Sequence, residues 1–152
     1  MLSDDETTYV DYCCDEAEKK DKKWCQDQCT SILSGLMKGS EDVIKKLFYY
    51  IMVCIYEDGH LTKWEYELVV PLAAKAGYVL NEYRDMDIWF RTRDMRDVRK
   101  KVVDCIKAHL RGCDKKTKEI FLQIGVLSGA CDGRVNEHER LFLLDIFGKD
   151  YH

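Results

Sequence analysis

A unit of eight residues built on Asp-Gly occurs twice in this chain, and it constrains the fold more than any other sequence feature. The copies are Asp58-Gly59-His60-Leu61-Thr62-Lys63-Trp64-Glu65 and Asp132-Gly133-Arg134-Val135-Asn136-Glu137-His138-Glu139. An Asp, a Gly, an aliphatic residue, a capping residue and a Glu coincide. An apolar helical pattern precedes and follows each copy, so the repeat extends beyond the octet. We predict two internally related helix–Asp-Gly–helix hairpins.

Helix-capping chemistry accounts for most of the shared residues. Glycine permits the left-handed turn that ends a helix, the aliphatic residue enters the core, and Thr62 or Asn136 begins the next helix. Glu65 and Glu139 stand at the third position after the cap, where each can complete a capping box, so both residues are ambiguous between cap and ligand. The turn would tolerate Asn or Ser in place of the Asp, so a functional hypothesis rests mainly on Asp58 and Asp132.

Apolar residues recur at intervals of three and four along most of the chain, which predicts an all-α, compact bundle of about seven helices without strands. We expect Pro71 to kink or break its helix. Residues 1–39 form a Cys-rich helical segment packed on the core formed by residues 40–152. The expected helices begin near Tyr12, Ser40, Thr62, Asn81, Asp94, Asp114 and Asn136, and the first runs to Met37.

Composition describes an ordinary globular chain, with 46% hydrophobic and 34% charged residues and a net charge of −4. That charge gives no general attraction to nucleic acid, and the one locally basic stretch, between Arg84 and Lys101, is interleaved with Asp. We therefore expect no nucleic-acid partner.

No apolar run is long enough to span a membrane and the first residues are acidic, so we expect a cytoplasmic protein.

An Asp and a Glu seven residues apart, present twice, also suggest a cation site. Four carboxylates would suit calcium, magnesium or manganese if the two hairpins face each other. The pattern matches the second half of an EF-hand loop. Its first and third positions would be Cys54 and Tyr56 in one copy, and Ser128 and Ala130 in the other, so the first carboxylates are missing and a working EF-hand is not expected.

The two D-G-x-[LV]-x-x-x-E units, each between two helical patterns, resemble the TerB family of tellurite-resistance-associated proteins and the wider TerB-like domains. The likeness covers roughly residues 40 to 148. It implies a compact helical fold with related halves, a stress-response setting and an acidic metal site. Carried over by position, that site falls on Asp58, Glu65, Asp132 and Glu139, with Glu57 as an additional candidate.

Four cysteines near the N-terminus form a second candidate site. Cys25 and Cys29 lie one helical turn apart, and Cys13 and Cys14 precede them, so four thiols could converge on zinc or undergo redox chemistry. Neither pair has the C-x-x-C spacing of structural zinc sites, which favours reduced, partly buried thiols. The histidines His60, His109, His138 and His152 show no metal-ligand spacing either.

No phosphate-binding loop or nucleophile elbow is present, so we do not expect an enzyme. The leading hypothesis is a TerB-like module that binds a divalent cation or a protein partner through an acidic surface where the two hairpins meet. The alternative is a purely structural interaction domain without a metal, in which the Asp and Glu residues only cap helices.

Overall fold

The computed structural model describes residues 7–59 and 61–151, and over these residues the chain is all-helical. The structure therefore confirms the predicted all-α class. The helices are α1 (Tyr9–Glu18), α2 (Lys22–Leu36), α3 (Glu41–Asp58), α4 (Lys63–Lys75), α5 (Arg84–Arg91), α6 (Met95–Arg111), α7 (Lys115–Ala130) and α8 (Glu137–Phe147). No strand occurs in the described part of the chain.

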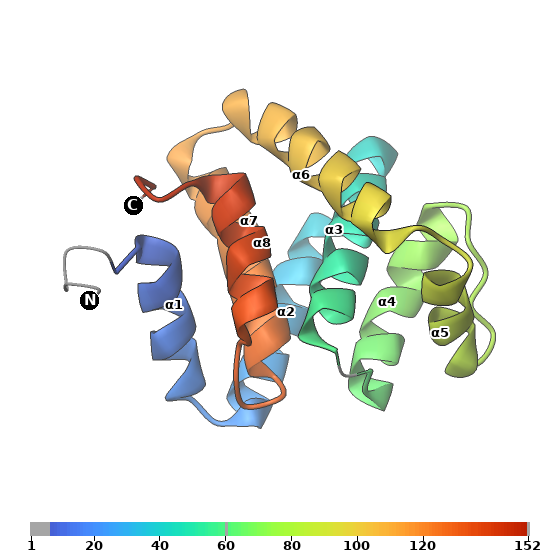
Figure 1. Ribbon diagram of the computed structural model, residues 1–152. Coiled ribbons are helices and arrows are strands. Elements are labelled where there is room, and N and C mark those ends of the chain that lie inside the picture. Colours follow the sequence, from blue (N-terminus) through green and yellow to red (C-terminus); the bar gives the residue numbers. More distant parts are fainter. Residues whose placement is uncertain (1–6, 60, 152) are drawn as a thin grey trace.

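Helix α3 is the centre of the bundle. It packs against α4, α6, α7 and α8, while α1 and α2 both pack against α7. Figure 1 shows α4 and α5 on one side of α3, α1, α7 and α8 on the other, and α6 crossing above. This arrangement brings the end of α3 close to the turn between α7 and α8, although more than seventy residues separate them in the sequence.

Helix α3 is buried on most of its sides, and large apolar side chains make up most of its buried residues. Tyr50 is fully buried, and its hydroxyl donates a hydrogen bond of 2.7 Å to the carbonyl of Phe121 on α7. A Cβ on Gly125 would lie 2.5 Å from both Tyr50 Oη and a methyl group of Leu143. Gly125 therefore allows α7 to approach α3 and α8 more closely than a larger residue would.

The predicted first helix is in fact two helices. Asp21 is the N-cap of α2, and its side chain accepts a 2.7 Å hydrogen bond from Trp24 N. An Asp in this position favours an extended backbone and a new helix start, so the segment from Tyr12 to Met37 is divided and the described helices number eight.

Two smaller expectations about helix boundaries are also corrected. Helix α4 continues through Pro71 to Lys75, so the proline does not break it, while the alternative of a kink stays a prediction. Helix α5, expected to begin near Asn81, begins at Arg84. Asp85 Oδ2 accepts hydrogen bonds from the backbone N–H groups of Asn81 and Glu82, both at 2.8 Å. The helices expected to begin near Ser40, Thr62, Asp94, Asp114 and Asn136 do begin there, and each of these residues is an N-cap.

One arginine on α8 forms several ion pairs with acidic residues of α1. Arg140 on α8 forms ion pairs with Asp11 at 3.2 Å, Asp15 at 2.9 Å and Glu18 at 3.1 Å. Glu18 also accepts a hydrogen bond of 2.7 Å from Val135 N. The N-terminal segment thus packs on the turn before α8.

Among the described helices, none is long and apolar enough to cross a bilayer.

Candidate metal centre

Each Asp-Gly unit lies at the junction of two helices. Asp58 is the last residue of α3, and Asp132 lies in the turn after α7. Gly59 and Gly133 have φ angles of 79° and 98°, the left-handed conformation that only glycine adopts readily. These turns aim the two Asp side chains into the space between the units.

Three carboxylates meet in that space. Asp58, Glu65 and Asp132 each offer one oxygen, and these atoms all lie within 4.8 Å of one another. Oxygens on opposite sides of a calcium ion, at roughly 2.4 Å each, are separated by about the same distance. The group therefore has the dimensions of a coordination shell for a hard cation.

Glu65 serves two purposes through its two oxygens. Its Oε1 accepts hydrogen bonds of 2.9 Å from both the backbone N–H and the hydroxyl of Thr62, which completes a capping box at the start of α4. Its Oε2 is buried and has no hydrogen-bond partner. One half of this carboxylate caps a helix and the other half is available to a ligand.

Glu139 differs from Glu65, because its side chain caps nothing. Its backbone N–H donates to Asn136 Oδ1 at 2.9 Å, but the carboxylate does not return to the cap. The residue is 0% exposed, and both carboxylate oxygens lack a hydrogen-bond partner. A fully buried carboxylate without any donor is costly unless it is protonated or neutralised by a cation.

Burial and neighbouring carboxylates raise the pKa values of Asp58, Glu65 and Glu139. The pKa of Asp58 rises to about 9, first through desolvation and then through the neighbouring Asp132 carboxylate. The pKa of Glu65 rises to about 7, again through desolvation and then Asp132. Desolvation also raises the pKa of Glu139 well above its ordinary value, with further contributions from Asp58 and Glu65. A cation that binds these carboxyl groups must therefore displace protons from them.

The second unit holds the first in place through Asn136. Its Nδ2 donates hydrogen bonds to the carbonyls of Glu57 at 3.1 Å and of Asp58 at 2.8 Å, while its Oδ1 caps α8. One amide side chain therefore satisfies terminal carbonyls of α3 and a terminal N–H of α8. This bridge fixes the separation between Asp58 and the second unit.

The cluster is buried, whereas the sequence hypothesis placed an acidic surface there. Asp58, Glu65 and Glu139 are 5%, 1% and 0% exposed, and Asp132 is partly exposed. The reason is that the helix ends converge, so their carboxylates face each other and not the solvent.

Glu57 does not join the three-carboxylate group. It lies 3.7 Å from Arg99 Nε on α6, so its charge is balanced by a guanidinium. Desolvation raises its pKa, and Arg99 opposes that rise. Of the five acidic residues predicted for the site, three form a metal-sized group, Glu139 lies behind them, and Glu57 pairs elsewhere.

The N-terminal thiols are buried but do not form a comparable group. Cys13 lies near Gln123 Nε2 at 3.8 Å, while Cys25 Sγ lies 3.6 Å from the carbonyl of Ala17. Burial raises the pKa of Cys29 to about 12 and also raises that of Cys14, so both thiols are held in the protonated form. In the described residues, the one metal-sized group found contains no cysteine. His60 and His152 lie outside the described residues.

Gly129 is a site residue that the sequence did not reveal. A Cβ at this position would lie 2.7 Å from Glu139 Cδ, so the absence of a side chain on α7 makes room for the buried carboxylate. The only sequence signal was a glycine inside an otherwise apolar helix, four residues after Gly125. Such spacing suggests close helix packing but does not indicate which side chain fills the space.

Comparison of the chain with protein-family models, with curated proteins and with solved structures finds no match.

Proposed function

We propose that this protein is a non-enzymatic module that binds one hard divalent cation between its two Asp-Gly units. Asp58, Glu65 and Asp132 are its direct ligands, and Glu139 is a fourth carboxylate behind them. The observation that carries the proposal is that five buried carboxylate oxygens in this cluster have no hydrogen-bond partner.

Buried carboxylates are normally paired with donors or cations. The five oxygens belong to four residues from both units, and they are the Oδ2 atoms of Asp58 and Asp132, Glu65 Oε2 and both oxygens of Glu139. A capping role alone uses only Glu65 Oε1 and leaves these oxygens unexplained. A divalent cation would satisfy several of them at once and offset the repulsion among them.

The donor set favours a particular class of cation. Carboxylate oxygens suit calcium, magnesium and manganese, whereas zinc and copper prefer nitrogen and sulfur ligands. The nearby thiols have raised pKa values, so they are not available as thiolate ligands at neutral pH. We therefore expect calcium, magnesium or manganese at the carboxylates in preference to zinc.

Calorimetric titration with each of these cations tests the proposal. Wild-type protein should bind one equivalent with a dissociation constant in the micromolar range or tighter, and binding should release protons because the carboxyl pKa values are raised. The double variant Asp58→Asn with Asp132→Asn should lose this binding. Absence of any wild-type binding tighter than millimolar would overturn the proposal in favour of a purely structural domain.

A matched control separates site-specific loss from a general change in charge. Asp27 and Asp104 are exposed carboxylates on α2 and α6, away from the cluster. Asp27→Asn with Asp104→Asn changes the formal net charge by the same amount and should leave the affinity unchanged within about twofold. An equal loss in this control would mean that the cation binds diffusely.

The resemblance of the two units to TerB-like domains supports the same residues and suggests a stress-response role. A protein partner that recognises the loaded form is part of this proposal, because a cation at the junction of α3, α4, α7 and α8 would stabilise their relative positions. Pull-down with and without the cation tests that extension, which fails if the captured proteins do not change.

A further inference from the structure

The N-terminal helices α1 and α2 lie against the second Asp-Gly unit, although the likeness to TerB-like domains does not extend to them. Both helices pack on α7, and α1 also packs on α8. Glu18, the last residue of α1, accepts a hydrogen bond from the unit, and Lys22, the first residue of α2, contacts it. Lys22 Cε lies 3.2 Å from the position that a Cβ on Gly133 would occupy. The turn that carries Asp132 is therefore flanked by both N-terminal helices.

Charged side chains hold both backbone groups of Val135. Its N–H donates to Glu18 Oε2 at 2.7 Å, and its carbonyl accepts from Arg140 Nε at 3.0 Å. Glu18 and Arg140 also pair with each other at 3.1 Å, so the three residues form a closed ring of contacts. Hydrogen bonds to charged groups are roughly twice as strong as neutral ones. The ring therefore fixes the backbone between the ligand Asp132 and the cap Asn136.

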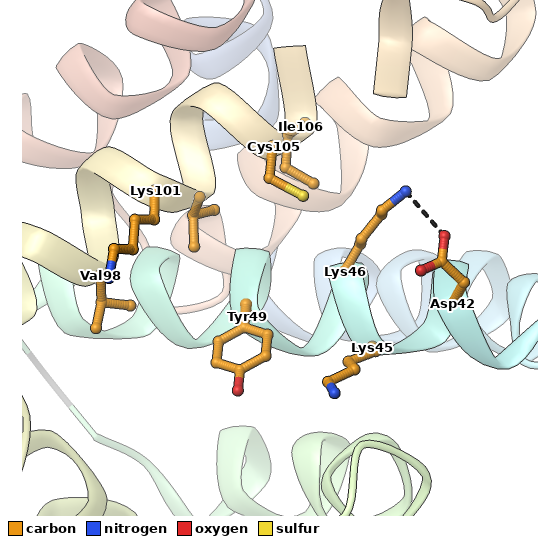
Figure 2. Close-up of a pocket in the computed structure, with 9 residues that line it drawn as sticks. Asp42, Lys45, Lys46, Tyr49, Val98, Lys101, Cys105 and Ile106 are labelled. Atoms are coloured by element: carbon orange, nitrogen blue, oxygen red, sulfur yellow. Dashed lines mark ion pairs between the residues drawn. The ribbon is translucent and has the colours of Figure 1, made fainter. Parts of the chain in front are cut away.

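The ion pairs beside the groove between α3 and α6 show how this ring differs from ordinary surface pairs. Lys46 pairs with Asp42 at 2.8 Å, the dashed line in Figure 2, and Lys101 pairs with Asp97 at 2.9 Å. Each of these pairs spans one turn of a single helix, and pairs of this kind contribute little to stability. The pair in the ring instead joins α1 to α8, across 122 positions of sequence. It is placed to fix one element relative to another.

The first Asp-Gly unit is held together by its own capping box, and the second is not. In the first unit, Glu65 Oε1 accepts from the backbone N–H of Thr62. In the second unit, the Glu139 carboxylate has no hydrogen-bond partner. A carboxylate from α1, that of Glu18, binds a backbone N–H of this unit instead, one residue before its cap. The N-terminal segment thus supplies a contact that the second unit does not make for itself.

We infer that Glu18 is a positioning residue of the cation site: through Val135 it holds the second Asp-Gly unit so that the Asp132 carboxylate faces those of Asp58 and Glu65. The inference rests on the cation function proposed above and adds to it a role for the N-terminal segment. Ligands that are fixed before the cation arrives bind it more tightly, because less conformational freedom is lost on binding. Mutation of residues that orient metal ligands typically lowers metal affinity by about 10- to 100-fold.

Two substitutions at Glu18 separate its reach from its charge. Glu18→Gln loses the charge but keeps an oxygen that can accept from Val135 N, whereas Glu18→Asp keeps the charge and is one methylene shorter. In calorimetric titrations with calcium and with manganese, Glu18→Gln should bind within about threefold of wild type, and Glu18→Asp at least about tenfold more weakly. Tight binding by Glu18→Asp with weak binding by Glu18→Gln would overturn the inference, because charge and not position would then set the affinity.

Glu16 provides a matched control on the same helix. It pairs with Lys19 at 3.1 Å on the surface and is not part of the ring. Glu16→Gln and Glu16→Asp repeat the two chemical changes and should each leave the affinity within about twofold of wild type. Losses at Glu16 as large as those at Glu18 would reject a specific role for Glu18.

Asp15→Asn distinguishes the contact with Val135 from the general anchoring of α1. Asp15 pairs with Arg140 at 2.9 Å, so this variant removes one anchor of α1 and leaves the hydrogen bond between Glu18 and Val135 in place. Cation affinity should stay within about threefold of wild type, even where Tm falls. A loss as large as that in Glu18→Asp would show that anchoring of α1 is sufficient and would overturn the positioning role.

Hydrogen exchange of the cation-free protein gives a second readout, which does not depend on cation binding. In Glu18→Asp the Val135 amide should exchange at least about tenfold faster than in wild type, while the amide of Ile51 in the buried helix α3 should be unchanged. Equal exchange at Val135 in both proteins, or equal acceleration at both amides, would contradict a local role.

The inference and the proposed function fail in different ways. Wild-type protein that binds neither calcium nor manganese would overturn the proposed function, and the positioning role with it. Wild-type binding that persists with equal affinity in Glu18→Asp would overturn the positioning role alone and leave the cation site standing.

Discussion

The two Asp-Gly units share five residue types and yet treat their glutamates in opposite ways. Glu65 of the first unit is a capping-box residue that keeps one oxygen for the cluster, whereas Glu139 of the second is buried with both oxygens unpaired. The Oδ1 atom of Asn136 caps α8 without the Glu139 carboxylate. Its Nδ2 atom donates to the carbonyl of Asp58 at the end of α3. Equal spacing in sequence therefore does not imply equal roles.

The origin of this difference lies outside the units themselves. Glu139 lies against Gly129 of α7, where a helix without a side chain leaves room for a carboxylate. Glu65 instead remains bonded to Thr62 at the start of its own helix. A helix neighbour, and not the local motif, decides whether the glutamate carboxylate caps its helix or is left without a hydrogen-bond partner.

Gly129→Ala should produce the largest effect, because it removes the space on which the asymmetry depends. The new Cβ would overlap the Glu139 carboxylate, the end of a fully buried side chain that would then have to leave its position beside α7. We expect a loss of about 3 kcal/mol in the free energy of unfolding, measured by urea denaturation, together with loss of cation binding.

Two controls sharpen that result. Gly35 is an exposed helical glycine at which an added Cβ would meet nothing within 4 Å, so Gly35→Ala should stabilise the protein by up to about 1 kcal/mol. In a Glu139→Ala background, Gly129→Ala should cost much less than in the wild type. Equal costs in the two backgrounds would show that Glu139 is not the residue that needs the space.

Local sequence chemistry was sufficient to predict the helical class, the starts of five helices and the acidic residues that converge. These features depend on residues within a few positions of one another, such as Thr62 with Glu65. The division at Asp21 was also locally encoded, but the helical pattern on both sides concealed it. An Asp three residues before Trp24 was the available signal.

The pairing of Glu57 and the burial of the carboxylate cluster depended on contacts between residues that are distant in the sequence. Nothing near Glu57 indicates that Arg99 will neutralise it, and nothing near Glu139 indicates that α7 will be close enough to cover it. The expected acidic surface became a buried cluster for the same reason, since the burial of a helix end is decided by the elements that pack on it.

The pH dependence of the cation-free protein tests whether Glu139 carries the greater electrostatic strain. In the folded state the pKa values are raised, to about 7 for Glu65 and about 9 for Asp58, whereas the unfolded chain has ordinary values of about 4. The folded state therefore binds more protons, and its stability falls as pH rises from about 5 to 9.

With a chelator present, Tm should fall by at least about 5 °C over this range. Glu139→Gln should reduce the fall, because one buried like charge is removed, and the exposed neighbour Glu137→Gln should not. Glu65→Gln should reduce it less than Glu139→Gln, since Oε1 of Glu65 already has two donors. A Tm that rises with pH would contradict the raised pKa values.

The two caps give the smallest and most direct test of the comparison. Thr62→Ala removes one helix cap and the hydroxyl that supports Glu65, and we expect a cost of about 1 kcal/mol in urea denaturation. Asn136→Ala removes a cap and also the donors to the carbonyls of Glu57 and Asp58, so its cost should approach about 2 kcal/mol. Asn136→Asp separates these contributions, because it keeps the capping oxygen, loses the amide donors and places a negative charge beside the terminal carbonyls of α3. If Asn136→Asp were as stable as wild type, the bridge between the units would contribute nothing, and Asn136 would be a helix cap equivalent to Thr62.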